Sequence, residues 1–416
     1  MTLTEDLFAD LPDHPETVAF EPTRQAGLAR LESFASRTGT HYASQRNFDL
    51  GPAQRSTVSA LSPWIRHRLI AEEEVLRQTL ARHSPSAAMK FIQEVFWRGY
   101  FKGWMQQHPS VWVSYQRGLQ SAQNELARSV HRNVDYQSAI EGRTGIACFD
   151  HWCLELKTTG YLHNHARMWF ASIWIFTLRL PWELGADFFL THLIDGDPAS
   201  NTLSWRWVGG LHTKGKTYLA RPSNIARYTQ GAFDPMGQLA QSAPPLIDDQ
   251  EHPFVPLNIV QPSVQGDALL LVTEEDCQPS FVCETPNDVL GLVLPREPDI
   301  AEKTHAFKQG AVTDAVTRLS AQGSVVTTYD WTSAMIAAAE QAATTQILTA
   351  FAPVGPITTK LESLQRELAM AGMTLHQQLR PYDALIWPHA TKGFFKLKKM
   401  IPTLLTDLGV TDAKTL

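Results

Sequence analysis

The segment from Gly160 to Trp207 constrains the fold more than any other part of the sequence. It reads GYLHNHARMWFASIWIFTLRLPWELGADFFLTHLIDGDPASNTLSWRW, and two short polar stretches interrupt its apolar pattern. Half of the twelve tryptophans of the chain lie at positions 152–207. A carboxylate in apolar surroundings must be paired or hydrogen-bonded, so Asp195 and Asp197 predict a nearby cation or ligand. The segment therefore indicates either a tryptophan-rich core with a helix–helix loop or a pocket that encloses a flat ligand.

The composition excludes a generally basic nucleic-acid-binding protein. The chain has 416 residues, which is long enough for two domains that each bury a core. Hydrophobic residues make up 44% and charged residues 19%, as in ordinary globular proteins. The formal net charge is −6, so any contact with DNA would need a local basic surface.

Several features indicate a cytoplasmic protein. The four cysteines show neither a metal-binding nor a disulfide-dense spacing, which is typical of a reducing compartment. The first fifteen residues are acidic and contain no apolar signal core, and no apolar run is long enough to cross a membrane. His151, His163 and His165 match no closed zinc pattern, so we expect no metal site.

Three segments of the first half predict helices or a helix entrance. Residues 16–34 place apolar side chains at helical spacing after a Pro-Thr start. Residues 55–65, RSTVSALSPWI, hold four hydroxyl side chains before a proline that can open a helix. Such an entrance suits an anion, although a plain helix cap gives the same pattern. Residues 87–107 form a strongly aromatic helix in which Glu94 and Trp97 share a face.

The central segment predicts two helices and a loop. The helices are expected at residues 161–178 and 182–193, with a turn at Pro181 between them. The stretch HLIDGDPASN is expected to be a loop because its glycine and Pro198 stop a helix, and Asn201 is expected to cap the helix that follows.

The last third of the chain changes in character. Residues 238–264 are proline-rich and without periodicity, which predicts a linker. Short strand patterns then alternate with helical patterns, and the alternation predicts a doubly wound parallel sheet. The strands are expected at 268–277, 289–295, 324–330, 346–351 and 383–388 (DALIWP), and the helices at 311–323, 334–346 and 357–372. No GxGxxG or P-loop is present, so this half by itself predicts no nucleotide.

The motifs HNHARM, LIDGDPASN and WRW together resemble the flavin-binding core of the DNA photolyase and cryptochrome family. The usual family patterns are H-N-R-x-R-M, L-I-D-G-D-x-A-x-N and W-x-W, at nearly the same spacings. EGRTG upstream and TQGAFDP downstream extend the resemblance, which covers residues 16–235 with specific motifs. Residues 265–416 resemble the family's α/β domain by pattern. Because that domain usually precedes the flavin domain, the resemblance implies a circular permutation.

The resemblance implies two domains and a cofactor. An all-α FAD-binding domain is expected at residues 1–242, a linker at 243–264, and an α/β doubly wound, Rossmann-like domain at 265–416. FAD is the implied cofactor. The resemblance leaves open whether an antenna chromophore binds to the α/β domain, and it indicates no protein partner.

The resemblance also assigns cofactor-binding residues. Asn201 would lie beside flavin N5, where a neutral amide suits a flavin reduced to its anionic form. Asp195 and Arg167 would form an ion pair over the isoalloxazine. The other implied cofactor contacts are Tyr42, Ser56, Thr57, Val58, Ser59, Arg98, Asn164 and Asp197. Since the family reads T-S-R-L-S where this chain reads R-S-T-V-S, we expect the diphosphate to be held in an altered form.

Catalytic and substrate residues follow from the same resemblance. Trp182 and Trp205 match the first two members of the family's electron-relay triad. Ala139 stands where the third tryptophan is usual, so Tyr136 or another aromatic residue is expected to replace it. The substrate-pocket matches are Glu94, Trp97, Met168 and Trp207. In repair enzymes the glutamate hydrogen-bonds the damaged pyrimidine pair, which makes Glu94 a catalytic candidate as well.

Two functions are consistent with the resemblance. The first is a light-driven photolyase that flips a UV-induced pyrimidine lesion out of DNA and donates an electron to it from reduced FAD. The second is a cryptochrome-like blue-light sensor or redox flavoprotein without repair activity. The acidic charge, Ala139, His165 in place of an arginine, and residues 216–229 in place of R-I-F-N-P favour the sensor. The retained pocket residues favour the photolyase, which we expect. The iron–sulfur branch is excluded because the flavin domain has only two cysteines.

Overall fold

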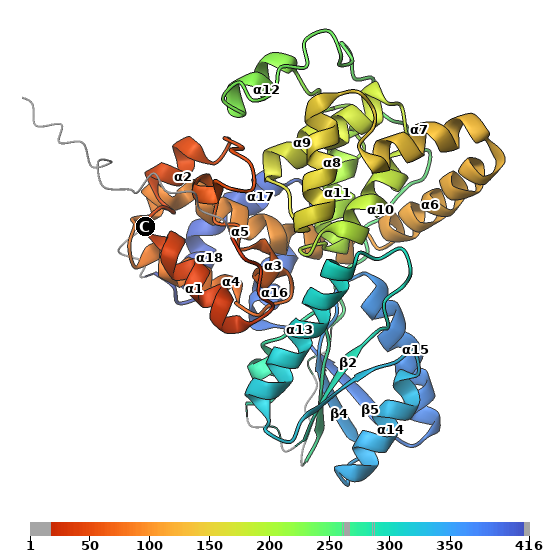
Figure 1. Cartoon of the computed structure of the whole chain (residues 1–416). Helices are drawn as coiled ribbons and strands as arrows, with labels where there is room; N and C mark the ends of the chain where they lie inside the picture. The colour runs from red at the N-terminus through yellow and green to blue at the C-terminus, as the bar shows by residue number, and fades with distance from the viewer. Residues whose placement is uncertain (1–17, 260, 262–266, 285, 287, 412–416) are drawn as a thin grey trace, which may run out of the picture.

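The computed structural model describes residues 18–411 apart from 260, 262–266, 285 and 287. A helical part comes first in the chain, and a parallel sheet flanked by helices follows (Figure 1). The helical part comprises α1 (Arg24–Ala35), α2 (Thr40–Gln45), η1 (Arg55–Thr57), α3 (Ser62–Arg66), α4 (Glu72–Leu80), α5 (Pro85–Gln106), α6 (Ser110–Arg128), α7 (Val130–Glu141), α8 (Ala147–Thr159), α9 (Asn164–Ser172), η2 (Ile173–Thr177), α10 (Trp182–His192), α11 (Pro198–Val208) and α12 (Pro222–Tyr228). None of the described helices is both long and apolar enough to span a bilayer.

The cap of α11 differs from our expectation. Asp197 caps α11, since its Oδ1 accepts a hydrogen bond of 2.8 Å from the backbone N–H of Ser200. Pro198 then takes the first helical position, where its fixed φ suits a helix and its missing N–H costs nothing. The prediction that Asn201 caps this helix was therefore wrong, because Asn201 lies within its first turn.

The sheet confirms the predicted parallel architecture. Its order is β3-β2-β1-β4-β5, and every neighbouring pair is parallel. The strands are β1 (Leu269–Val272), β2 (Asp288–Val293), β3 (Ser324–Thr327), β4 (Gln346–Ala350) and β5 (Thr374–Gln378). Alternate side chains of β1 pack on α13 (Glu302–Leu319) on one face, and on α14 (Trp331–Gln341) and α15 (Pro356–Met370) on the other. A short helix, η3 (Pro279–Phe281), follows β1. The described residues therefore form a doubly wound α/β layer beside a helical layer.

The prediction of a strand at DALIWP was wrong. These residues belong to α16 (Pro381–Ile386) and η4 (Trp387–His389), and α16 opens with a proline at its first position. The fifth strand is instead β5, whose sequence TLHQQ lies at the edge of the sheet and is mostly half-buried. An edge strand that is only partly covered does not need an apolar run.

The C-terminal helices return to the helical part (Figure 1). After β5, the elements α16, η4 and α17 (Phe394–Lys398) contact α5, and α18 (Ile401–Asp407) follows them. Buried side chains of this segment share a core with α3, α4 and α5. The expected boundaries at 242 and 264 remain predictions.

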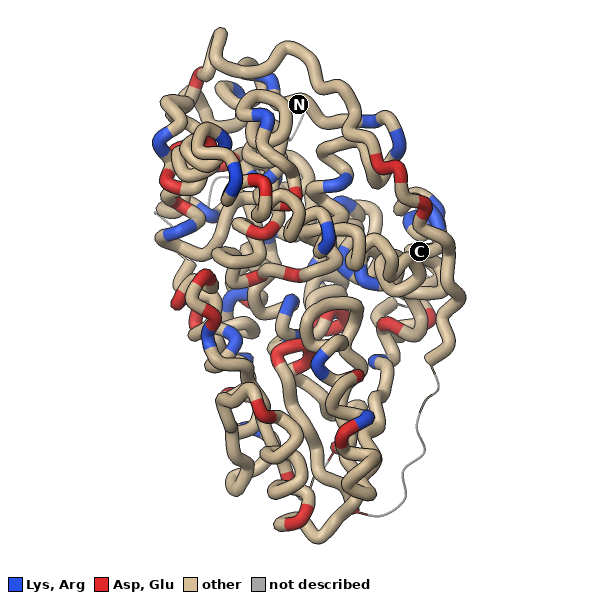
Figure 2. The backbone as a smooth tube through the Cα atoms, turned by 90° about the vertical axis from the view of Figure 1, so that its right-hand side faces the viewer, with Lys and Arg blue, Asp and Glu red and all other residues tan. Residues whose placement is uncertain are grey.

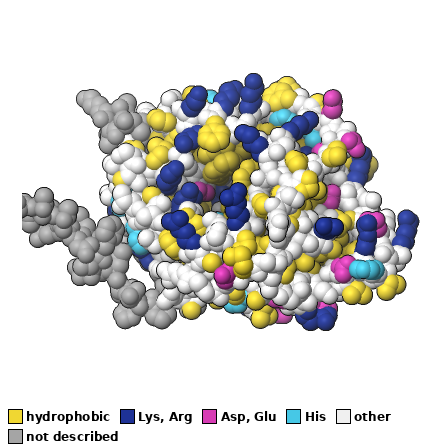
Figure 3. Space-filling model, turned by 90° about the horizontal axis from the view of Figure 1, so that it is seen from above, with side chains coloured by type: hydrophobic (Ala, Val, Ile, Leu, Met, Phe, Trp, Pro, Cys, Tyr) yellow, Lys and Arg dark blue, Asp and Glu magenta, His cyan; other side chains and the backbone are white. Residues whose placement is uncertain are grey.

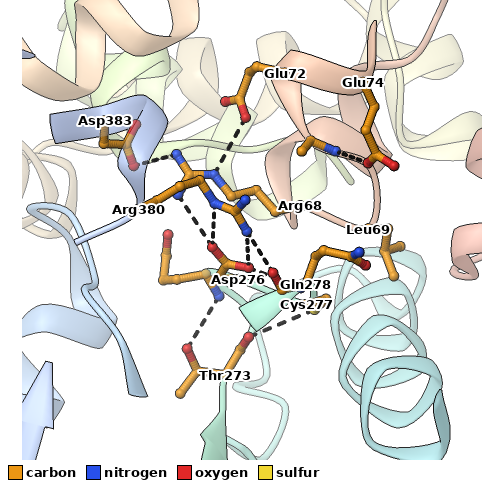
Figure 4. Close-up of polar contacts among 12 residues, drawn as sticks. Arg68, Leu69, Glu72, Glu74, Thr273, Asp276, Cys277, Gln278, Arg380 and Asp383 are labelled. Atoms are coloured by element: carbon orange, nitrogen blue, oxygen red, sulfur yellow. Dashed lines mark hydrogen bonds and ion pairs between the residues drawn. The ribbon is translucent and has the colours of Figure 1, made fainter. Parts of the chain in front are cut away.

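Buried charges line the junction between the two parts. Acidic and basic residues of the helical part and the sheet part lie close together there (Figure 2). Arg68, from the turn after α3, pairs with Asp276 and Asp383, and Arg380 pairs with Asp276 (Figure 4). These side chains are at most 7% exposed, so each charge depends on its partner rather than on water.

Gly103 tests how tightly the C-terminal segment packs. A Cβ at Gly103 would lie 2.7 Å from Cδ1 and 2.9 Å from Cα of Trp387. We expect Gly103→Ala to lower the free energy of unfolding by about 1–3 kcal/mol in urea denaturation, because the backbone of η4 must move. Gly393→Ala is the control, since a Cβ there meets nothing within 4 Å. Equal losses for both variants would contradict this packing.

Candidate functional site

The loop between α10 and α11 holds two buried carboxylates. Asp195 is 4% exposed, and Arg167 Nη2 donates to its Oδ2 at 2.9 Å. Arg167 Nε donates to the backbone oxygen of Leu162 at 2.9 Å, which fixes the guanidinium in place. The structure thus brings together the two residues that the sequence predicts to pair.

Several groups keep Asp195 ionised. Burial alone would raise its pKa, but the positive charges of Arg167 and Arg98 outweigh burial and hold the pKa below its usual value. The Ser62 side chain, at the start of α3, also helps to lower this pKa. Asp195 Oδ1 is buried and has no hydrogen-bond partner among the described residues, so it can accept a bond from a ligand.

Asp197 lies between two cations that sequence reasoning missed. Its Oδ2 is 3.4 Å from Lys102 Nζ and 3.6 Å from Arg66 Nε, and all three side chains are at most 3% exposed. Burial would raise the pKa of Asp197, but the charges of Lys102 and Arg66 together with the Ser200 N–H hold it well below its usual value. One signal was present, because Lys102 lies four residues after Arg98 and so shares its face of α5.

Asn201 faces inward from the first turn of α11. Its Nδ2 donates to the backbone oxygen of Ala186 at 2.8 Å, which anchors α11 to α10. A side-chain amide has two N–H donors and one carbonyl acceptor. Asn201, 8% exposed, therefore keeps Oδ1 and one N–H for a ligand.

The hydroxyl-rich segment is held mainly through its backbone. Arg30 donates to the carbonyl oxygens of Arg55, Val58 and Ser59, at 3.2, 3.1 and 2.7 Å. The Thr57 hydroxyl donates to the Phe48 carbonyl at 2.9 Å. Ser62, just beyond the expected cofactor contacts, is the residue of this segment whose side chain helps to lower the pKa of Asp195.

Two more expected cofactor residues of the first half lie nearby. Ser56 is half-buried, and its carbonyl oxygen accepts from Arg37 at 3.3 Å. Tyr42 is buried with its ring edge-on to Phe91, at a centroid distance of 5.0 Å. Within the part of the chain that the structure describes, no hydrogen bond or ion pair joins either side chain to Asp195, so their cofactor role stays a prediction.

The expected substrate residues already have partners in the protein. Arg46 Nη1 donates to Glu94 Oε1 at 2.7 Å. The ring of Phe394, from α17, stacks on Trp97 with centroids 3.8 Å apart and planes 13° apart. Trp207 stacks on a neighbouring tyrosine, and Met168 is half-buried. Asn164, which the resemblance assigns to the cofactor rather than to the substrate, is exposed at the start of α9.

Two aromatic paths start near α10. Trp205 is 2% exposed, and the centroid of its ring lies 6.1 Å from that of Trp174. The ring centroid of Trp174 in turn lies 6.1 Å from that of Tyr136. Trp182 instead contacts Tyr115 at 5.6 Å. The first row of rings therefore runs from Trp205 through Trp174 to Tyr136, which is half-buried on α7. Ala139, where the family usually has a tryptophan, is fully buried.

One face of the helical part is hollowed. Seen from the side on which α12 lies, Lys and Arg side chains surround a hollow lined by hydrophobic side chains (Figure 3). This charge pattern differs from the acidic balance of the whole chain. An apolar hollow with a basic rim suits a flat ligand that carries phosphate groups.

Comparison with known proteins identifies the helical part. Residues 91–250 match the family model of the FAD-binding domain of DNA photolyase. Residues 91–250, less than half of the chain, are therefore similar to the FAD-binding domain of DNA photolyase. This match includes Arg98, Lys102 and the whole loop with Asp195 and Asp197.

Similar proteins include several photolyases. The deoxyribodipyrimidine photo-lyase of Synechococcus is 31% identical over 194 residues, which cover 45% of this chain and 38% of the relative. The enzyme of the same name from Escherichia coli is 28% identical over 244 residues, which cover 56% and 48%. The class III photolyase structure from Agrobacterium tumefaciens is 25% identical, covers 51% and 44%, and has a TM-score of 0.42. The chain thus spans less than half the length of these relatives.

The described residues fit a flavin. Asp195 Oδ1 and His163 Nε2 are buried and lack hydrogen-bond partners among the described residues, as a site completed by a polar ligand would require. Burial lowers the pKa of His163 to about 4, so its imidazole is neutral. Asn201 adds an amide, and Arg98 adds a positive charge.

Asp197 tests the electrostatics of this loop. Asp197→Asn keeps a helix cap but removes the charge between Lys102 and Arg66. We expect the free energy of unfolding at pH 7 to fall by about 3 kcal/mol, because buried cations lose their partner. The pKa of Asp197 in the folded state lies below its ordinary value of 3.8. The ionised carboxylate therefore stabilises the wild type above pH 3.8, and this stabilisation is lost as the pH falls from 3.8 toward the folded-state pKa.

The difference in the free energy of unfolding between the wild type and Asp197→Asn should therefore become smaller at acid pH. Urea denaturation at neutral pH and near pH 3 measures it. Asp330→Asn is the matched control, because Asp330 caps α14 in the same way but is exposed. Similar effects of the two substitutions would contradict the ionic role of Asp197.

Proposed function

We propose that this chain binds FAD in the helical part and uses light to drive electron transfer from it. The observation that carries the proposal is the loop with Asp195 and Asp197, which places a buried unpartnered carboxylate oxygen beside Arg167 inside a matched FAD-binding domain. FAD supplies the chemistry, since an excited reduced flavin is a strong one-electron donor. We also propose that the order of the two parts is a circular permutation of the family arrangement.

In this proposal the protein's residues orient and isolate the cofactor. The Asp195–Arg167 pair and the Asn201 amide would hold the isoalloxazine end of the cofactor. Arg98 contributes positive charge that favours an anionic flavin. The rings of Trp205, Trp174 and Tyr136 would lead an electron from the surface to the buried site, with Trp174 in the place expected for Trp182.

The preferred reaction is repair of UV-induced pyrimidine lesions in DNA. The named relatives are deoxyribodipyrimidine photo-lyases. A basic rim around an apolar hollow suits two adjacent pyrimidines that are flipped out of a phosphate-bearing strand. Glu94 and Trp97 lie one turn apart on α5, where a carboxylate and an indole can bind the lesion.

A sensor without repair activity is the second candidate. Two of the four expected substrate residues are occupied, since Glu94 is paired with Arg46 and one face of Trp97 is covered by Phe394. A lesion would have to displace the first partner or use the other face of the indole. This observation favours a flavoprotein whose pocket is closed to DNA.

The two candidates differ in one assay. The purified chain should show the visible absorption of bound flavin, and blue light with a reductant should remove lesions from a UV-irradiated oligonucleotide. Absence of flavin would contradict both candidates. Flavin that is photoreduced while the lesion persists would support the sensor.

Trp205 tests the aromatic path. Trp205→Phe should slow photoreduction of the flavin by at least about tenfold, because phenylalanine is much harder to oxidise than tryptophan. Trp112→Phe is the control, since Trp112 contacts Tyr115 on the other path. The rate of flavin bleaching under blue light measures the effect, and equal rates in both variants and the wild type would remove Trp205 from the path.

A further inference from the structure

One guanidinium connects the loop between α10 and α11, called the flavin loop below (residues 193–197), to the sheet part of the molecule. Arg66, the last residue of α3, donates through Nη1 and Nη2 to the two carboxylate oxygens of Glu275, at 2.9 and 2.8 Å. Through Nε it donates to the Gly196 backbone oxygen at 3.0 Å, and it lies 3.6 Å from Asp197 Oδ2. Glu275 follows β1, whereas Gly196 and Asp197 belong to the loop that carries the proposed FAD contacts.

The geometry leaves Arg66 little freedom. Its side chain is 2% exposed and that of Glu275 is 5% exposed, so water cannot replace either partner. A bidentate arginine–carboxylate pair fixes the plane of the guanidinium as well as its position. That plane directs Nε at the Gly196 carbonyl. The orientation of the flavin loop therefore depends on a carboxylate from the other part of the chain.

The backbone around Arg66 reinforces this connection. The Cys277 N–H donates to the His67 carbonyl at 2.9 Å, and His67 Nδ1 lies 2.8 Å from the Glu274 carbonyl oxygen. His67 Nε2 lies 3.2 Å from the Ile194 carbonyl oxygen, at the start of the flavin loop. The turn after α3 is thus held between the loop that follows β1 and the loop that precedes α11.

Asp276 provides a natural comparison within the same loop. It is as buried as Glu275, and Arg380 binds it in a bidentate manner at 2.9 and 2.8 Å. Its other ion pair is with Arg68. Among the described residues, no ion pair of Asp276 reaches the flavin loop (Figure 4). The two neighbouring acids are thus both buried and both bind an arginine in a bidentate manner, but only the arginine of Glu275 contacts the loop with Asp195 and Asp197.

We propose that Glu275 is a positioning residue of the flavin site. It fixes Arg66, and Arg66 fixes the Gly196 carbonyl and the Asp197 cap, on which the direction of α11 and of Asn201 depends. The inference rests on the FAD binding proposed above. It adds that the sheet part sets the geometry of the flavin loop through one carboxylate.

Two matched substitutions in the full chain test this role. Glu275→Gln keeps the shape but removes the charge that orients Arg66, and Asp276→Asn makes the same change one residue later. Flavin fluorescence after dilution measures the rate of FAD release, and urea denaturation measures stability. We expect both variants to be less stable, but FAD release to rise at least about tenfold only in Glu275→Gln.

A conservative variant separates positioning from general destabilisation. Glu275→Asp keeps the charge, and we expect release of FAD between the wild-type and Glu275→Gln rates together with a wild-type shape of the flavin absorption band. If Glu275→Gln does not fold, the comparison of Glu275→Asp with Asp276→Asn takes its place, and faster release only in Glu275→Asp is then the supporting result.

Each outcome decides the inference. Equal release rates in the Glu275 and Asp276 variants, whether fast or unchanged, would overturn the positioning role while leaving FAD binding intact. A wild-type protein that retains no FAD would overturn the proposed function and this inference together.

Discussion

Buried pairs of arginine and carboxylate hold the two parts of this molecule together. Arg66 and Arg68 of the helical part pair with Glu275 and Asp276, which follow β1. Arg380 and Asp383, from the segment after β5, pair with Asp276 and Arg68, and all of these side chains are nearly excluded from water. Removing one member of such a pair costs about 3–5 kcal/mol, because the other charge stays buried and uncompensated. The helical part and the sheet part are therefore coupled by charges that neither can expose without loss. The loop with Asp195 and Asp197 lies at the end of this network, so its geometry is coupled to the junction.

Much of the architecture could be predicted from local sequence. The alternation of strand and helix patterns after residue 264 predicted the doubly wound sheet, because a buried parallel strand such as β1 (LLLV) is a continuous apolar run. The exceptions are a polar edge strand, β5, and a helix at DALIWP that a proline initiates. The Asp195–Arg167 pair was predictable because a carboxylate within an apolar segment requires a partner, and Arg167 was the nearest cation.

The partners from distant segments could not be predicted. Lys102 and Arg66 flank Asp197 only because α5 and α3 pack beside the flavin loop. Nothing in the sequence around position 394 indicates that Phe394 stacks on Trp97 nearly three hundred residues earlier. The same limit explains the hydroxyl-rich segment, where Arg30 takes the carbonyl groups and Ser62 reaches Asp195. Contacts of this kind depend on how helices pack, which no local pattern records.

The missing side chain at Gly185 sets the spacing of the two helices that carry the site. A Cβ there would lie 2.3 Å from the Trp205 ring and 2.9 Å from that of Trp174. Its neighbour Ala186 offers the carbonyl that anchors Asn201. A single methyl group at this position would push α10 away from α11. The same movement would separate the rings of Trp174 and Trp205 and lengthen the hydrogen bond from Asn201 to the Ala186 carbonyl. The contact between the two indoles and the position of the Asn201 amide thus both depend on the distance between the axes of α10 and α11. Neither can be changed without changing the other.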